Sequence, residues 1–404
     1  MARGARLLRT VAILIGGLLT LWISIGITAN FTIGRQTPAL MRVIWPAGVT
    51  AKVTEGRELL VASPAASVGR LDQARHTLRD AAVREPINTL TLGTLAALDE
   101  LRGDHDRARL LFGLSEAVSR RNRLTELWMI EDAVARGNIA EALTHYDRAM
   151  RVSIDLRPTL LPVLNAAASD ADVRKALVPV LRQRPLWWKD YIQLLGTSGR
   201  DPRVMATALY NVRPNIMQSD ERILAENVLR RMVAIQGDRE AARVANALEG
   251  INDTTRSLRG GDFNGTSGIL PFAWWLRDES NIRAYRDIVP NGTTGLRVET
   301  SEDTTGGVAQ QLVSLSEGDY ILSGVVGDVP ADPANRPAIT VTCSDNRPIT
   351  RFVLPPAPHN GAPFRFRFTT PGAKCATQWV NILTASVGDT NVWFDSITLL
   401  PIRH

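Results

Sequence analysis

Hydrophobic and polar residues follow three different patterns along the chain. Residues 11–29 form an almost unbroken apolar run. From about residue 67 to residue 250, apolar residues recur at spacings of three and four, which predicts amphipathic helices. After residue 256 they alternate in short runs bounded by turn residues, which predicts β-strands. We therefore predict a multidomain chain of the α-then-β class.

The apolar run has the length of a membrane-spanning helix, which needs about 20 apolar residues. Three arginines precede it and no charged residue lies between Arg9 and Arg35, so the N-terminus is expected in the cytoplasm. The alternative is a cleaved signal peptide, whose apolar region is shorter, about 7–15 residues. We predict a bacterial inner-membrane protein with a periplasmic body. Its expected N-terminal parts are a cytoplasmic tail (1–9), a transmembrane helix (10–30) and a linker (31–55).

The helical region contains a pattern that repeats every 34 residues. Gly69, Gly103 and Gly137 are each followed five residues later by an alanine. A large residue follows each alanine after four positions, and a small residue after seven. Glycine lets the chain turn sharply between two helices. The period therefore predicts helical hairpins that bury their apolar faces by stacking.

This pattern resembles the tetratricopeptide repeat, whose unit is a 34-residue helix pair. The resemblance implies an α-solenoid over residues 56–155, although the tryptophan and tyrosine positions of the family's first helix are not kept. After residue 155 the likeness thins, and Gly237 and Ala242 restore the glycine-to-alanine spacing. We interpret residues 156–252 as degenerate hairpins that continue the solenoid. A separate helical bundle is the alternative.

Residues 256–404 are predicted to form an antiparallel β-sandwich. Phe364, Phe366 and Phe368 alternate with arginines, which indicates a strand with one buried face and one wet face. Further short runs of this kind occur at near-regular spacing, as is typical of a sandwich or barrel.

The tail also resembles the jelly roll of carbohydrate-binding modules. The segment 260–264, followed by Phe272 and Trp274, is similar to the opening of that group, and the segment 392–397 is similar to its closing strand. In such modules one acid at each of these places can hold a structural calcium ion. Here Asn264 replaces the first acid, and Asp395 alone is a poor calcium site. We therefore predict no metal site and no cofactor.

The resemblance implies glycan binding through exposed aromatic side chains, on which sugar rings stack. Trp274 and Trp393 lie in stretches that are typical of sandwich core. The candidate platforms are therefore Trp275 and Trp379. Nearby polar groups that could complete a site are Asp278, Asn281 and Arg283.

A second aromatic cluster, Trp187, Trp188 and Tyr191, lies in the helical region. It has two interpretations: a patch that binds a protein partner, or helix-packing core. The histidines of the repeats, including His145, have no fixed relation to one another. We interpret them as surface or packing residues.

Cys343 and Cys375 are the only cysteines, and they are expected to form a disulfide in an oxidising compartment. Zinc is not expected beside them, because neither has a second cysteine or histidine nearby. The formal net charge is +6, but arginines alternate with acids along the helices. The dense basic stripe of a nucleic-acid binder is missing, so no nucleic-acid partner is predicted.

No sequence motif of an enzyme is present: there is no nucleophile elbow, phosphate-binding glycine loop, HExxH or zinc spacing. We therefore predict a non-enzymatic scaffold of the cell envelope, accessory to polysaccharide or exopolysaccharide assembly. Its repeats would bind envelope proteins and its sandwich would bind glycan. The rival hypotheses are a pure protein–protein scaffold and, third, a polysaccharide-modifying enzyme.

Overall fold

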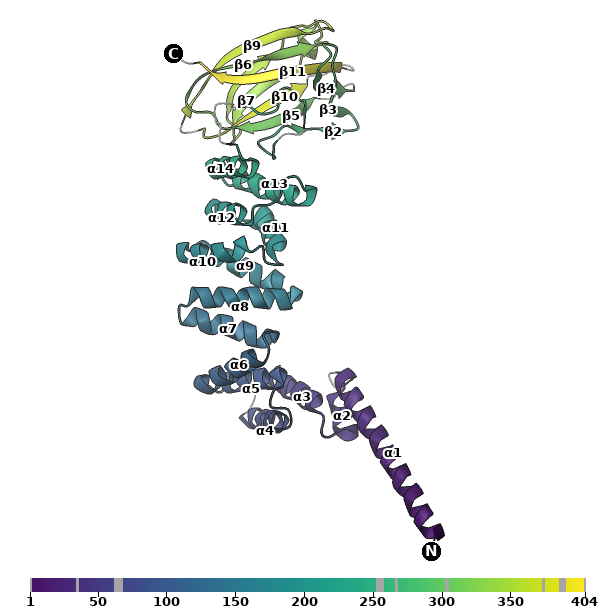
Figure 1. Ribbon diagram of the computed structural model, residues 1–404. Helices are drawn as coiled ribbons and strands as arrows, with labels where there is room; N and C mark the ends of the chain where they lie inside the picture. Colours follow the sequence, from purple (N-terminus) through teal and green to yellow (C-terminus); the bar gives the residue numbers. More distant parts are fainter. Residues whose placement is uncertain are drawn as a thin grey trace. The chain divides into compact units, whose positions relative to one another are not determined.

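The computed structural model describes residues 2–33, 36–61, 68–251, 258–265, 268–301, 305–372, 375–384 and 390–402. The chain divides into two compact units, Met1–Leu156 and Arg157–His404. The first unit is helical, and the second combines helices with an antiparallel two-sheet β-sandwich (Figure 1). The predicted order of helices followed by a sandwich is confirmed.

The first unit is built mainly from helical hairpins. Helix α5 pairs with α6 and α7 with α8, while α3 pairs with α4. Helix α5 begins at Thr89 and α7 at Arg123, 34 residues later, and the second helices of these two hairpins are offset by the same number. The helices are α1 Ala2–Thr32, α2 Pro38–Ile44, α3 Val49–Val61, α4 Val68–Arg84, α5 Thr89–Leu101, α6 His105–Val118, α7 Arg123–Ala135 and α8 Ile139–Val152, before the 3-10 turn η1 Ile154–Leu156.

Asparagine side chains begin the first helix of both repeated hairpins. Asn88 accepts hydrogen bonds from the amides of Leu90 and Thr91, and Asn122 does the same 34 residues later. Such N-caps satisfy backbone donors that the helix itself leaves free.

Among the described residues, no helix combines the length and the apolar character that crossing a membrane requires.

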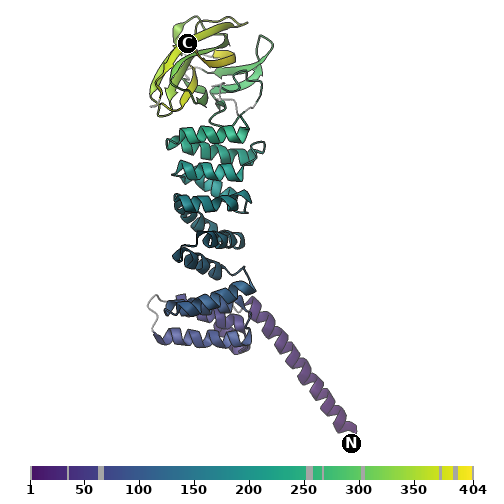
Figure 2. The ribbon, with the colours of Figure 1, turned by 60° about the vertical axis from the view of Figure 1, so that its left-hand side comes forward.

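Helices of the second unit pack mainly with the next helix but one. Helices α9, α11 and α13 form one layer and α10, α12 and α14 form the other, as Figure 2 shows from the side. This arrangement differs from the first unit, where the main contacts lie within each hairpin. Their bounds are α9 Arg157–Ala167, α10 Ala171–Arg182, α11 Trp188–Ser198, α12 Pro202–Val212, α13 Ser219–Ala234 and α14 Asp238–Glu249.

The sandwich consists of a five-stranded sheet, β1-β5-β10-β7-β8, and a six-stranded sheet, β2-β3-β4-β11-β6-β9. Apolar residues from both sheets fill the space between them, and Phe364 and Phe368 are among them, as the alternation predicted. The strands are β1 Trp275–Leu276, β2 Asp278–Glu279, β3 Ile282–Ile288, β4 Thr294–Thr300, β5 Gly306–Val313, β6 Gly318–Gly327, β7 Ala338–Cys343, β8 Pro348–Val353, β9 Ala362–Thr370, β10 Gln378–Thr384 and β11 Thr390–Pro401.

Cys343 and Cys375 form a disulfide that joins the end of β7 to the segment before β10. Their Cα atoms lie 5.3 Å apart, and the bond closes a loop across 32 positions of sequence. Both cysteines are buried. The bridge therefore holds together two neighbouring strands of the five-stranded sheet.

Candidate functional site

The outer face of the five-stranded sheet carries a row of aligned side chains, one from each strand. Strand register places one residue from each strand side by side, each partnered with the next. We call this set the Trp275 row, and from edge to edge it contains Trp275, Gln310, Asn381, Thr340 and Arg351.

The outward direction of the row follows from strand alternation. On β10, Val380 and Ile382 are buried in the core between the sheets. Trp379 and Asn381 therefore point to the opposite side. Because directly paired residues share a face, the partners of Asn381 on β5 and β7 point outward as well.

The row combines an aromatic ring with uncharged hydrogen-bonding groups. Trp275 is 39% exposed at one end. The carboxamides of Gln310 and Asn381 can each donate and accept, as sugar hydroxyl groups require. Asn381 Nδ2 donates to Thr340 Oγ1 at 3.4 Å. The row contains no carboxylate, and Arg351 ends it with a positive charge at the far edge.

Trp379 lies on the same outer face, two positions from Asn381 along β10. Its neighbours across the sheet are Leu312 and Thr342, and its side chain is half-buried. From strand spacing and residue rise, its Cα lies about 12 Å from that of Trp275. The structure therefore brings both tryptophan candidates onto one surface.

A hollow of ≈ 290 Å³ adjoins Trp275. It lies between the sandwich and α13, both within the second unit, and Trp274 and Arg286 also line it. Trp274 Nε1 and Arg286 Nε are buried donors with no acceptor among the described residues. Burial lowers the pKa of the Arg286 guanidinium. An acceptor oxygen supplied by a ligand would satisfy such donors.

The polar candidates Asp278, Asn281 and Arg283 belong to the other sheet and do not join the row. Asn281 and Arg283 line a polar hollow of ≈ 380 Å³ at the β3–β4 edge. Arg283 forms an ion pair with Asp278 at 3.4 Å and lies over the ring of Tyr285. Asp278 and Arg283 are therefore paired with each other, and all three residues lie on a different sheet from the two tryptophans or in its turns.

Trp274 and Trp393 are both buried, but in different places. Trp274 packs in the core between the sheets. Trp393, expected there too, is paired with Arg297 and Gly327 and lies on the opposite side of its strand from the core residue Phe394. It is covered by the segment around Gly361, and its Nε1 donates to the carbonyl of His359 at 3.1 Å. Trp393 is therefore closed to a ligand, whereas Trp274 offers only its Nε1 to the hollow beside Trp275.

The aromatic cluster of the helical region is buried and offers no exposed patch. Trp187, Trp188 and Tyr191 are 1%, 7% and 0% exposed. Burial raises the pKa of Tyr191 far above its ordinary value. The partner-binding interpretation of these three residues is therefore corrected: they pack α11 against its neighbours.

Asp395, the carboxylate considered for calcium, is buried on β11. It accepts hydrogen bonds from Asn291 Nδ2 at 3.1 Å and Thr293 Oγ1 at 2.6 Å. The amide of Ser396 donates to its other oxygen at 2.6 Å, so all of these partners are neutral. This arrangement ties the β3–β4 loop to the closing strand.

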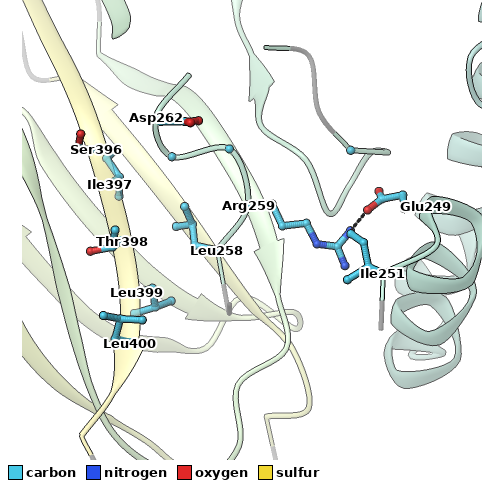
Figure 3. Close-up of a pocket in the computed structure, with 13 residues that line it drawn as sticks. Glu249, Ile251, Leu258, Arg259, Asp262, Ser396, Ile397, Thr398, Leu399 and Leu400 are labelled. Carbon is cyan, nitrogen blue, oxygen red and sulfur yellow. Dashed lines mark hydrogen bonds and ion pairs between the residues drawn. The ribbon is translucent and has the colours of Figure 1, made fainter. Parts of the chain in front are cut away.

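A hollow of ≈ 850 Å³ lies where α14 meets the start of the sandwich (Figure 3). Arg259 bonds Glu249 and Asn246 there, and Glu249 also accepts from the amide of Ile269 at 2.6 Å. Burial raises the pKa of Glu249, although Arg259 opposes the shift. The described lining holds no aromatic ring, and its Arg259 and Glu249 are paired with each other, so these two residues form a structural joint between α14 and the sandwich.

Comparisons with known proteins add fold likenesses only. No protein-family model matches the chain, and no curated protein does. Similar solved structures include an α-L-arabinofuranosidase with bound arabinose (9% identity, 37% of this chain and 26% of that chain, TM-score 0.28). A CBM4 structure has 17% identity over 36% of this chain and 100% of that chain, with a TM-score of 0.27. A TmCBM61 complex with β-1,4-galactotriose has 12% identity over 36% of this chain and 99% of that chain, also with a TM-score of 0.27. The chemistry of the site therefore has to come from its own residues.

Sequence reasoning found the two tryptophans but missed the rest of the row. Gln310, Asn381, Thr340 and Arg351 come from four strands, and only strand register brings them together. One signal was present in the sequence. Trp379 and Asn381 alternate with the apolar residues of β10, so they had to share a face.

Proposed function

We propose that the sandwich binds an oligosaccharide along the Trp275 row. The observation that carries the proposal is the register that aligns Trp275 with Gln310 and Asn381 on one outer face. A sugar ring would stack its apolar C–H face on Trp275. The carboxamides and the Thr340 hydroxyl would bind its hydroxyl groups. Trp379 would bind a second sugar ring of the same oligosaccharide.

The test is glycan binding by the full-length protein. A glycan array, followed by calorimetric titration with β-1,4-linked gluco-, galacto- and xylo-oligosaccharides, should identify a ligand. Trp275→Ala should weaken its binding at least tenfold, because the variant loses the apolar ring on which a sugar would stack. Trp275→Phe should retain most of the affinity.

The matched control is Ile288→Ala. Ile288 is 68% exposed but lies on the other sheet, so its removal should leave affinity unchanged. Circular dichroism would establish that each variant keeps its fold. The proposal fails if the array shows no glycan ligand, or if Trp275→Ala and Trp379→Ala both bind as well as the unaltered chain.

We also propose that the helical hairpins, interpreted as tetratricopeptide-like repeats, bind protein partners in the cell envelope. The supporting observation is an apolar stripe on α6: Leu110, Leu114 and Val118 follow one another at four-residue intervals and are 63%, 47% and 47% exposed. Such a stripe suits another helix. Leu114→Glu should abolish capture of the partner in crosslinking of intact cells, and unchanged capture would refute this role.

Attachment to an inner membrane and a periplasmic location are part of the same proposal. On α1, Leu18, Leu21 and Ile25 are each more than half exposed, and the disulfide suits an oxidising compartment. Carbonate extraction should leave the chain with the membrane, and protease added to spheroplasts should digest it. A chain protected from protease would refute the periplasmic location.

A further inference from the structure

Three titratable side chains from successive helices of the first unit converge on one point. Glu116 comes from α6, Glu126 from α7 and His145 from α8. One ligand atom from each lies within 4.8 Å of the other two. Glu126 is fully buried and His145 is 3% exposed, while Glu116 is half-buried.

The central carboxylate is only partly satisfied. Glu126 Oε2 lies 2.7 Å from His145 Nδ1, but Oε1 is buried with no hydrogen-bond partner among the described residues. Glu116 is paired with Arg148 at the edge of the cluster. A buried carboxylate oxygen without a donor is costly. A hydrogen-bond donor or a cation would satisfy this oxygen.

The preceding hairpin shows that packing does not require these polar residues. Thirty-four residues earlier, the places of Glu126 and His145 are occupied by Leu92 and Leu111. Leu92 is buried, and Leu111 packs against the core of its own hairpin. A leucine pair therefore suffices for this fold. Placing an acid and an imidazole here costs desolvation that the hairpin could avoid.

We propose that Glu116, Glu126 and His145 bind a divalent transition-metal ion, with zinc as the best fit. Two carboxylates and one imidazole are a donor set that Zn²⁺ accepts, and three protein ligands leave a fourth position for water. Tetrahedral bonds of this kind separate neighbouring ligand atoms by about 3.3 Å. His145 Nδ1 and Glu126 Oε2 are 2.7 Å apart, and one ligand atom of each of the three residues lies within 4.8 Å of the other two, so small side-chain shifts suffice.

The ion would join α6, α7 and α8 and so fasten two successive hairpins together. Entry is available from the side of Glu116, the one ligand that is not buried. Binding would displace any proton shared by Glu126 and His145, since metal ligands must be deprotonated. Arg148 would remain on Glu116 as its second partner.

Titration of the untagged full-length chain, stripped with EDTA, tests this directly. In a calorimetric titration, one Zn²⁺ ion should bind per chain, and it should raise the midpoint temperature of thermal unfolding. Mg²⁺ should do neither. Co²⁺ should give the visible absorption of a tetrahedral nitrogen–oxygen site. Glu116→Gln, at the half-buried edge, should weaken Zn²⁺ binding at least tenfold.

The decisive variant replaces Glu126 and His145 together by leucine, as in the preceding hairpin. It should fold and lose the Co²⁺ spectrum. His105→Ala removes an exposed histidine, whose Nδ1 lies 2.9 Å from Glu100, and should change nothing. The proposal is overturned if the unaltered chain binds no Zn²⁺, or if the double variant binds it with the same affinity and stoichiometry.

Discussion

Trp275 and Trp379 face the same side of one sheet, on strands separated only by β5. Their Cα atoms lie about 12 Å apart, given the spacing of strands and residues. One small sugar cannot cover both rings, whereas an oligosaccharide can. The proposed glycan site is therefore long enough for more than one sugar ring.

From this separation we predict that affinity depends on the length of the glycan. It should rise with each added sugar until the chain reaches from one tryptophan to the other, and then level off. In Trp379→Ala the rise should stop earlier, while the shortest ligands bind as before. Titrating a length series against both proteins measures this. Equal losses at every length would contradict a two-ring site.

Gly361→Ala should destabilise the sandwich, by about 1–3 kcal/mol. A Cβ at Gly361 would lie 2.6 Å from Trp393 Cη2, and the residue has φ of +87°. Gly292→Ala is the matched control, because its φ is +85° but nothing lies within 4 Å of its Cβ position. Urea unfolding should show the larger loss for Gly361→Ala. Equal losses would mean that the contact with Trp393 adds nothing.

Asn122→Ala should lower stability by about 1–2 kcal/mol, because it removes the N-cap of α7. The same side chain donates to the carbonyl of Thr89 at 2.6 Å and so also ties α7 to the preceding hairpin. Asp104→Ala is the control, because Asp104 occupies the N-cap position before α6 but its side chain forms no capping hydrogen bond. Thermal unfolding of both variants makes the comparison. An effect of Asp104→Ala as large as that of Asn122→Ala would contradict this assignment.

Reduction of the Cys343–Cys375 bridge should lower stability by about 3 kcal/mol, since it closes a loop of about 30 residues. Cys343→Ala with Cys375→Ala should have a similar effect without reductant. Thiol titration of the unreduced chain should find no free thiol. Two reactive thiols would show that the bond is not formed in solution.

Asp238 should make stability depend on pH. Burial raises its pKa above the ordinary 3.8, and Asp345 adds to the rise, although Ser344 donates to it at 3.3 Å. The folded chain therefore keeps this proton to higher pH than the unfolded chain. Stability should fall as pH rises from about 3.8 through the raised pKa.

Asp238→Asn should remove this component. As the pH rises from about 3.8 through the raised pKa, the urea midpoint of Asp238→Asn should increase relative to that of the unaltered chain. Groups that do not interact with Asp238 titrate alike in both proteins and cancel in the difference. A difference that stays constant with pH would contradict the raised pKa.

Periodic patterns in the sequence predicted the elements of this chain well. The 34-residue spacing of Gly103 and Gly137 corresponds to two hairpins with the same offset. The alternation around Phe364 corresponds to β9. Periodicity succeeds because it reports which face of an element is buried, and burial is what the fold selects.

Side-chain partnerships between distant segments were beyond the sequence. Trp393 and Trp274 look alike in sequence, yet only the second lies between the sheets, because a loop covers the first. Asn281 is close to Trp275 in the chain but belongs to the other sheet. The chain passes from one sheet to the other between β1 and β2, so residues that are close in sequence lie on different sheets.

The equal length of the two repeated hairpins has an evolutionary consequence. A duplication of the 34-residue unit formed by α5 and α6, or its loss, would join helix ends at equivalent positions, because α7 and α8 repeat the same offsets. A variant with one such unit more or fewer should therefore keep every turn of the remaining hairpins.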